Sequence, residues 1–361
     1  MKYLSEFHNI NIIRKLARDI RDTVREREIT LMEVCGTHTM AIARYGIRSL
    51  LPDSLRLISG PGCPVCVTPV SYIDQAIFIA RQADVMITTF GDMMRVPGSE
   101  SSLEKERARG ADIRIVTSTM EALALAEEKK EKKIVFLGVG FETTIPTVGV
   151  VIRTAKKLNV QNFYVLSSHK IMPPAMTALC EGDVALDGFL CPGHVSTITG
   201  TDSYGPIARN YKKGCVIAGF EPVDVLQAVL MLCRQIIAGR PEVRNQYRRV
   251  VRPEGNPKAK AVIQDVFENC DAEWRGLGFI RESGLSIRCE YAFADASIHF
   301  DIPRKKTEEP AGCRCGDVLR GRIAPEACGL FGTACTPDSP VGACMVSSEG
   351  SCAAAYRYRS G

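Results

Sequence analysis

The feature of this sequence that most constrains its fold is a repeated alternation of short apolar runs with longer amphipathic stretches. Several intervening stretches have apolar residues at helical spacing, as in the predicted helices 71–83, 120–130 and 222–238. Such an alternation is typical of parallel sheets covered by helices on both faces, so an α/β fold is expected. Eight runs are predicted to be strands: 29–34, 55–58, 85–89, 113–117, 134–138, 163–167, 188–191 and 216–219.

The number of strands predicts two doubly wound parallel-sheet domains that face a cleft, and a Cys-rich C-terminal domain is expected after them. A chain of 361 residues is long enough for more than one hydrophobic core. After residue 240 the composition changes, first to a charged and proline-rich stretch and then to a glycine-punctuated, strand-like one. The predicted units are an N-terminal docking helix at 1–28, α/β domains at 29–132 and 133–240, and the C-terminal domain at 241–361.

Three cysteines follow the first two predicted strands. Cys35 begins the run Cys35-Gly36-Thr37-His38-Thr39, and Cys63 and Cys66 end the run Gly60-Pro61-Gly62-Cys63-Pro64-Val65-Cys66. Because the carboxyl ends of parallel strands meet at one edge of a sheet, we expect these thiols to share a crevice. This crevice is the candidate site.

The chemistry of these residues suits a soft metal or a redox disulfide. A helix is expected from Thr39 to Leu50, and a thiol just before a helix amino terminus has a lowered pKa. In a reducing compartment the Cys63/Cys66 spacing is typical of a redox pair or of half a metal site, with two inert buried thiols as the alternative. His38 could act beside Cys35, although a backbone-bonded histidine at a helix start is the simpler interpretation.

Other strand-end loops could add polar groups to the same crevice. The loop 90–98 could do so or be a plain connection. Glu142 could be a general acid or base, or a helix-capping carboxylate. Its loop lacks both G-x-G-x-x-G and the Walker lysine, so it gives little support to nucleotide binding. His169 and His194 follow further strands and could face a ligand or be ordinary surface or capping residues.

The last fifty residues carry a second concentration of thiols among Gly, Pro and Ser. This segment has little apolar material for a core, and metal ligation would supply the missing folding energy. Six thiols exceed one four-thiolate site by two, which favours an iron-sulfur cluster with a dithiol beside it over tetrahedral zinc. The six are Cys313, Cys315, Cys328, Cys335, Cys344 and Cys352. Core packing is expected for Cys180, Cys215, Cys233 and Cys270.

Composition excludes several classes of protein. No run is apolar over the length of a membrane span, and the start of the chain lacks a signal-peptide core, so a cytoplasmic protein is expected. Fifteen cysteines in a reducing compartment indicate metal binding or catalysis rather than a disulfide framework. The net charge of +5 is spread thinly and aromatic-interleaved basic patches are absent, so nucleic-acid binding is not indicated.

Taken together, the motifs resemble those of the HypD family of hydrogenase maturation factors along nearly the whole chain. The two thiol motifs above are the first elements of this resemblance. The others are Gly140-Phe141-Glu142-Thr143-Thr144, Cys191-Pro192-Gly193-His194-Val195, Cys315-Gly316-Asp317-Val318-Leu319 and Pro340-Val341-Gly342-Ala343-Cys344-Met345.

The resemblance implies a scaffold on which the Fe(CN)2CO group of [NiFe]-hydrogenases is assembled. It implies HypC as the partner that shares the mononuclear iron and leads to the hydrogenase large-subunit precursor, and HypE as the source of cyanide made from carbamoyl phosphate. By motif, Cys35 is the iron-binding thiolate and Cys63 and Cys66 are a redox pair beside it. His194 and His169 are candidates to stabilise the anionic iron centre, and Glu142 to manage a proton.

The resemblance also implies roles for the C-terminal thiols. Cys315 and Cys344 resemble the cluster-adjacent disulfide of ferredoxin-thioredoxin reductases, although Cys315 could be a ligand and Cys313 the spare thiol. The rival function is a stand-alone iron-sulfur thiol-disulfide oxidoreductase, and a nucleotide-dependent enzyme ranks last. The implied ligands of a [4Fe-4S] cluster are Cys313, Cys328, Cys335 and Cys352.

Overall fold

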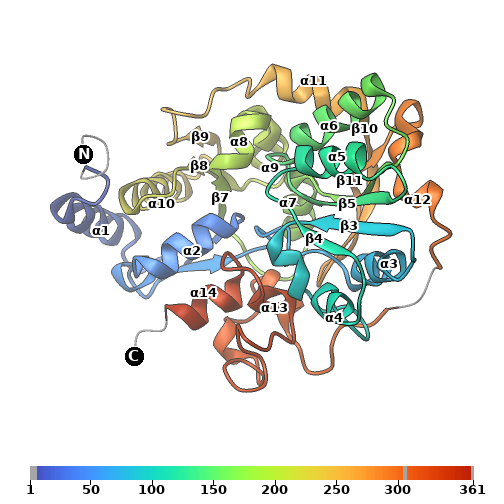
Figure 1. Ribbon diagram of the computed structural model, residues 1–361. Coiled ribbons are helices and arrows are strands. Elements are labelled where there is room, and N and C mark those ends of the chain that lie inside the picture. The colour runs from blue at the N-terminus through green and yellow to red at the C-terminus, as the bar shows by residue number, and fades with distance from the viewer. Residues whose placement is uncertain (1–5, 304–306, 359–361) are drawn as a thin grey trace.

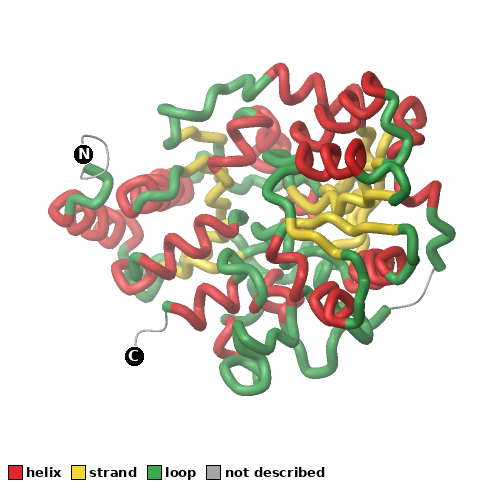
Figure 2. Tube along the Cα trace, viewed as in Figure 1, coloured by secondary structure: helices red, strands yellow, loops and turns green. Residues whose placement is uncertain are grey.

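The computed structural model describes residues 6–303 and 307–358. In this part of the chain two parallel sheets lie side by side, with an antiparallel hairpin beside the second sheet (Figure 1). Much of the C-terminal segment is loop with short helical turns (Figure 2). None of the described helices is long and apolar enough to cross a membrane.

The first sheet has five parallel strands in the order β2-β1-β7-β8-β9. One face is covered by α10 (Pro222–Ile237), and α1 (Ile10–Val24) packs on α10 through buried apolar residues at helical spacing. The opposite face packs against residues of the C-terminal segment. The strands are β2 (Leu55–Ser59), β1 (Ile29–Glu33), β7 (Gly188–Pro192), β8 (Gly214–Ala218) and β9 (Val243–Asn245).

The second sheet has four parallel strands in the order β4-β3-β5-β6. Helix α3 (Val70–Ala80) packs on one face, and α5 (Thr119–Glu128) and α6 (Ile145–Leu158) on the other. Helices on both faces explain why β3 and β5, in the middle of this sheet, are buried almost throughout. The strands are β4 (Ile113–Ile115), β3 (Val85–Thr89), β5 (Lys133–Gly140) and β6 (Phe163–His169).

The strand order departs from the predicted division at residue 132. Strands β3 to β6 form one sheet, and they are inserted between β2 and β7 of the other. The chain returns to the first sheet at β7, which pairs with β1 so that Leu31 lies opposite Gly188. Apolar periodicity identifies a strand but does not encode its neighbour, so the α/β class follows from the sequence and this nesting does not.

The rest of the described chain packs around the two sheets. The strand-like stretch after residue 266 forms the hairpin β10 (Phe267–Trp274) and β11 (Gly278–Ile287), which lies against β6. Near the C-terminus α14 (Ser351–Arg357) packs on α2 (Gly36–Arg44). The remaining helices are α4 (Leu103–Ala108), α7 (Met172–Cys180), α8 (Gly193–Thr199), α9 (Gly205–Asn210), α11 (Pro257–Val266), α12 (Ala296–His299) and α13 (Cys315–Leu319). Short 3-10 turns are η1 (Ile47–Leu50), η2 (Gly91–Arg95), η3 (Asp202–Tyr204), η4 (Cys289–Ala294), η5 (Pro325–Ala327) and η6 (Ala343–Met345).

Candidate functional site

A cavity of about 490 Å³ lies where the carboxyl ends of both sheets meet. Loops after β1, β2 and β7 of the first sheet line it together with loops after β3 and β5 of the second, and residues 347–349 of the C-terminal segment complete it. The loop 90–98 contributes its first four residues, so it is more than a connection. Among the lining residues are Cys35, Thr37, Cys63, His194 and Glu349.

Cys35 stands directly before α2, as the N-cap residue, and is buried. The backbone N–H groups of Thr37 and His38, in the first turn of α2, favour the thiolate and lower the pKa of this thiol. Burial is the stronger effect and raises the pKa of Cys35 to about 12. The expected lowering of this pKa by the helix is therefore wrong for the metal-free protein, because desolvation outweighs the helix amino terminus. A cation that binds Cys35 has to displace a proton.

Gly62 brings the two thiol loops into contact. A Cβ at Gly62 would lie 2.0 Å from the backbone nitrogen of Cys35, so only glycine allows this approach. The Gly36 N–H donates to the Gly62 carbonyl over 2.8 Å and fixes the arrangement. The parallel pairing of β1 with β2 places both loops at one edge, as the sequence predicts.

Cys63 and Cys66 face different surroundings. The Cys66 N–H donates to the Cys63 sulfur over 3.3 Å, and both thiols are buried. Cys63 lines the cavity, whereas Cys66 lies behind it and hydrogen-bonds with the thiol of Cys344. Burial raises the pKa of Cys66 well above its ordinary value. The pair thus connects the cavity with the C-terminal segment.

Of the predicted histidines, only His194 lines the cavity, where its ring stacks on Phe220 at 4.0 Å. Burial lowers the pKa of His194, and the Glu349 charge opposes that shift. The His38 ring nitrogen Nε2 lies 3.0 Å from the Gly219 carbonyl oxygen, which agrees with the simpler, backbone-bonded interpretation. Burial lowers the pKa of His38 to about 4, so its ring is neutral.

His169 and Glu142 are not among the residues that line the cavity. His169 packs edge-on against Phe267 of the hairpin and bonds to Ser167. Glu142 accepts a 2.9 Å hydrogen bond from the Met172 N–H at the start of α7, which is the capping role. Burial raises the pKa of Glu142 to about 7. β6 and the loop after β5 direct these two side chains into the packed interior and away from the cavity. The expectation that both reach the crevice is therefore wrong.

Two acidic residues of the site were missed by sequence reasoning. Glu349 accepts a 2.7 Å hydrogen bond from the Thr37 hydroxyl, across 312 residues of chain. No periodicity links such distant positions, so no sequence signal pointed to it. Glu33 is fully buried below Cys35 and accepts a 3.0 Å hydrogen bond from the Cys35 N–H and another from the Thr39 hydroxyl. Glu33 ends a buried strand two residues before Cys35, and an acidic residue at such a position could have indicated a functional role from the sequence.

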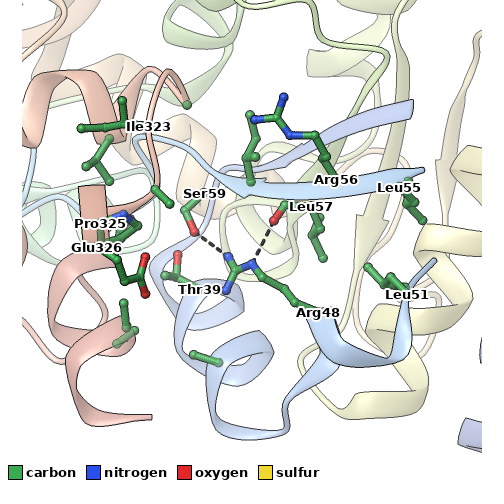
Figure 3. A pocket seen from close by; sticks show the side chains of 18 residues that line it. Thr39, Arg48, Leu51, Leu55, Arg56, Leu57, Ser59, Ile323, Pro325 and Glu326 are labelled. Atoms are coloured by element: carbon green, nitrogen blue, oxygen red, sulfur yellow. Dashed lines mark hydrogen bonds between the residues drawn. The ribbon is translucent and has the colours of Figure 1, made fainter. Parts of the chain in front are cut away.

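A second cavity, of about 340 Å³, lies along the open edge of β2 (Figure 3). Arg48 crosses this edge and donates to the Leu57 carbonyl over 2.9 Å and to the Ser59 hydroxyl over 3.0 Å. The described residues that line this second cavity include no cysteine or histidine, and most of them are apolar. The thiol-lined cavity is therefore the candidate site.

The C-terminal thiols gather directly behind Cys66. The Cys344 thiol hydrogen-bonds with those of Cys315, Cys352 and Cys66, and its bond with Cys315 raises the pKa of Cys344. Cys313 hydrogen-bonds with Cys315, while Cys328 is half-buried at the edge of the same apolar cluster. All fifteen cysteines lie within the described residues and are free thiols.

Whether an iron-sulfur cluster fits the C-terminal segment depends on the thiols available as ligands and on the room beside them. A Cβ at Gly342 would lie 2.5 Å from the Cys315 sulfur and 2.6 Å from the Cys313 sulfur, so this glycine leaves the room beside two thiols. Within residues 6–303 and 307–358, no group of three or more His, Cys, Asp or Glu is arranged to hold a metal ion. A [4Fe-4S] cluster takes one thiolate on each iron and does not need its ligands to converge on one ion. The residues present fit the group in kind and in number.

Comparison with known proteins gives the family of the chain. The family model HypD, described as "Hydrogenase formation hypA family", matches residues 11–359. "Hydrogenase maturation factor HypD2" of Bradyrhizobium diazoefficiens is 48% identical over 368 residues, covering 99% of this chain and 97% of that protein. "Hydrogenase maturation factor HypD" of Escherichia coli is 47% identical over 368 residues, covering 99% and 98%. The matches span the whole of the fold and the candidate site, and the chain belongs to the HypD family.

Proposed function

We propose that this protein is the scaffold on which the iron of [NiFe]-hydrogenases receives its cyanide and carbon monoxide ligands. Family membership gives the coarser role, which is hydrogenase maturation. In the proposal Cys35 binds the incoming iron as cargo, together with a cysteine of the partner HypC. The observation that carries it is the shared cavity of Cys35 and Cys63, with Cys66 joined behind them to the C-terminal thiols.

The cavity has the chemistry that this cargo needs. Thiolate sulfur suits low-spin iron, and the Thr37 and His38 N–H groups would stabilise the Cys35 thiolate once iron has displaced its proton. Cyanide makes the iron centre anionic, and His194 at the cavity wall can donate a hydrogen bond to it. Glu349 would hold Thr37, and with it the start of α2, in place. His169 and Glu142 have no part in the proposal, since they do not line the cavity.

The thiols behind the cavity would carry electrons to Cys63 and Cys66. When these two form a disulfide, the Cys344 thiolate attacks the Cys66 sulfur and Cys63 leaves as a thiolate. The Cys315 thiolate then attacks Cys344, which releases Cys66 and leaves a Cys315–Cys344 disulfide. Two electrons have moved to the Cys63/Cys66 pair, and the two protons that Cys344 and Cys315 gave up balance the exchange. The contact between Cys66 and Cys344 supports this order of exchange.

Cys313, Cys328, Cys335 and Cys352 would hold a [4Fe-4S] cluster, which when bound would pass single electrons from an external one-electron donor, two in succession, to the Cys315–Cys344 disulfide. The four thiols lie in or against one apolar cluster together with Cys315 and Cys344. Thiolate ligation would also stabilise a segment that has few regular elements of its own. Cyanide would arrive from HypE, and the finished group would leave through HypC to the hydrogenase large-subunit precursor in the cytoplasm.

Infrared and Mössbauer spectroscopy of the full chain, purified anaerobically with HypC, tests the proposal. Stretching bands of cyanide and carbon monoxide are expected together with a low-spin iron signal separate from that of the cluster. The Cys35→Ala variant should lose the cyanide and carbon monoxide bands and the low-spin iron signal. Diatomic bands of unchanged intensity in that variant would show that Cys35 does not hold the iron.

The second candidate is a stand-alone thiol-disulfide oxidoreductase, which the Cys66 to Cys344 contact also fits. Such an enzyme needs only a dithiol and an electron source, and has no use for Cys35, which lines the same cavity as Cys63. If the Cys35→Ala variant matured hydrogenase normally, the oxidoreductase would be the better account.

A further inference from the structure

Phe220 is an aromatic residue beside the cavity that the proposed function does not use. Its ring stacks on the His194 ring with 4.0 Å between the ring centres, although Phe220 is not among the described residues that line the cavity. The part of the chain that the structure describes has four apolar clusters, and Phe220 belongs to none of them. Packing of a core therefore does not explain why a large aromatic side chain lies here.

The first sheet itself brings the two rings together. β7 and β8 pair in parallel with Pro192 opposite Ala218. His194 and Phe220 are each two residues beyond this pair, so they leave the sheet side by side. Gly193 gives the ring its room, since a Cβ there would lie 3.2 Å from Cζ of Phe220 and 2.5 Å from the Ala218 carbonyl oxygen. The stacking of the two rings therefore follows from the register of the strands.

His38 holds the loop of Phe220 from the side of Cys35. The centres of the His38 and Phe220 rings are 4.8 Å apart. The His38 ring nitrogen Nε2 faces the Gly219 carbonyl oxygen, and because a carbonyl only accepts, Nε2 carries the proton and donates. His38 is in the first turn of α2, whose N-cap residue is Cys35. Phe220 therefore links the start of α2 to His194, because it contacts a histidine on each side.

A buried acidic residue holds the other side of the same loop. The Gly219 N–H donates to the side-chain oxygen of Gln246 over 3.1 Å, and the Gln246 amide nitrogen donates to Asp224 over 2.8 Å. Asp224 is fully buried and pairs with Arg249, whose guanidinium lies over the Tyr247 ring at 4.5 Å. Hydrogen bonds thus fix the backbone before Phe220 from two sides, so its ring is a firm support.

We propose that Phe220 positions His194 in the cavity and that His38 ties this support to α2. The purpose of the support rests on the proposed function, in which His194 donates a hydrogen bond to a cyanide ligand of the iron. A ring already held in place loses little rotational freedom when that bond forms, and preorganised donors stabilise an anion better than mobile ones. Phe220 is thus a positioning residue, because it acts on the iron centre only through His194.

Nuclear magnetic resonance of the full chain without iron at Cys35, with isotope-labelled histidines, tests the positioning directly. The chain has five histidines, and His194→Ala identifies the His194 signal. Relaxation of the ring carbons measures motion of the ring on the picosecond to nanosecond timescale. Phe220→Met keeps an apolar side chain of similar volume but has no flat ring, so the His194 ring should become mobile. Phe293→Met, at another half-buried phenylalanine, is the matched control and should leave that ring rigid.

Infrared spectroscopy of the iron-loaded full chain, purified anaerobically with HypC, tests whether the iron centre uses this support. His194→Ala should shift a cyanide stretching band, because the hydrogen bond to that ligand is lost. Phe220→Met should shift the same band in the same direction by a smaller amount, because a mobile ring makes the bond only part of the time. The double variant should match His194→Ala, since Phe220 acts only through His194. A further shift in the double variant would overturn the proposal.

The two measurements separate this proposal from the proposed function. A His194 ring that stays rigid in a folded Phe220→Met variant would overturn the positioning role. Unchanged cyanide bands in that variant would overturn the part that concerns the iron. Phe220→Leu is a second variant without an aromatic ring, and it decides both points if Phe220→Met does not fold. A wild-type chain that never shows cyanide bands would refute the proposed function, while the mobility of the His194 ring would still decide the role of Phe220.

Discussion

The thiol of Cys66 hydrogen-bonds with the thiol of Cys344, which joins the dithiol loop of the first sheet to the C-terminal segment. Glycine makes this possible, since a Cβ at Gly350 would lie 3.0 Å from the Cys66 sulfur and 2.3 Å from the Cys344 carbonyl oxygen. A two-domain architecture could have left a wide gap between these thiols. Instead they form one continuous group, so thiol exchange needs no domain movement.

Cys35→Ala should abolish binding of the mononuclear iron and leave the cluster absorbance unchanged. The reason is that Cys35 lines the cavity, while the proposed cluster ligands lie behind Cys66. Iron analysis with visible spectroscopy measures both quantities. The exposed Cys289→Ala variant is the control and should retain both. Loss of iron and absorbance together in Cys35→Ala would refute the separation of the two sites.

Cys328→Ala or Cys335→Ala should lower iron content and solubility together. Ligation is expected to supply folding energy to a segment made largely of loops. The measurements are iron per chain and the thermal unfolding midpoint, with Cys180→Ala as a half-buried control outside the segment. A colourless variant with an unchanged midpoint would contradict the prediction.

Cys315→Ser should keep the cluster and the iron bound at Cys35, yet slow the reduction of a Cys63–Cys66 disulfide. Cys315 contacts Cys344, and the second exchange step needs its thiolate. Thiol trapping with mass spectrometry follows the disulfide over time. Electron paramagnetic resonance of Cys313→Ser is the companion measurement. A cluster lost in Cys315→Ser but kept in Cys313→Ser would reverse the ligand assignment.

Gly62→Ala should destabilise the fold by about 3 kcal/mol and weaken iron binding. The added carbon would meet the backbone of Cys35, which cannot move aside as a flexible side chain can. Urea unfolding measures the free energy. Gly329→Ala is the matched control, because a Cβ there meets nothing within 4 Å. Similar midpoints for the two variants would mean that the loops do not need their close contact.

Glu142→Gln should remove part of the pH dependence of stability between about pH 4.5 and 7. The pKa of Glu142 rises from 4.5 to about 7 on folding, so the unfolded chain loses its proton first as the pH increases. This carboxyl therefore stabilises the wild-type fold fully below pH 4.5, and that contribution, at most about 3 kcal/mol, is lost by pH 7.

The free energy of unfolding at several pH values measures this effect. A glutamine cannot ionise and still accepts the Met172 N–H, so the variant should be the more stable protein at pH 7 and above. Glu127→Gln, at an exposed position on α5, should keep the wild-type profile. A Glu142→Gln profile as steep as that of wild-type would show that this carboxyl does not titrate on unfolding.

The sequence predicted local structure well where a single pattern decides it. Residues 85–89 form a strand with the predicted bounds, and Cys35 and Cys63 share a crevice because adjacent parallel strands end at one edge. The pairing of segments that lie far apart in the sequence could not be predicted from such patterns. Nothing in residues 188–191 indicates that they pair with β1, and nothing near Glu349 indicates Thr37 as its partner. The pKa of Cys35 was misjudged because desolvation depends on packing from distant segments.

The nested order of the sheets has a consequence for synthesis on the ribosome. The chain makes Cys35, Cys63 and Cys66 early, but the first sheet cannot join β1 to β7 until residue 192 has emerged. Residues 347–349, which complete the cavity, come later still. During translation the reactive thiols are therefore present for a long time without their binding site. Under the proposed function, incoming iron therefore meets a complete binding site only after nearly the whole polypeptide has folded, so the iron would be loaded after translation and not during it.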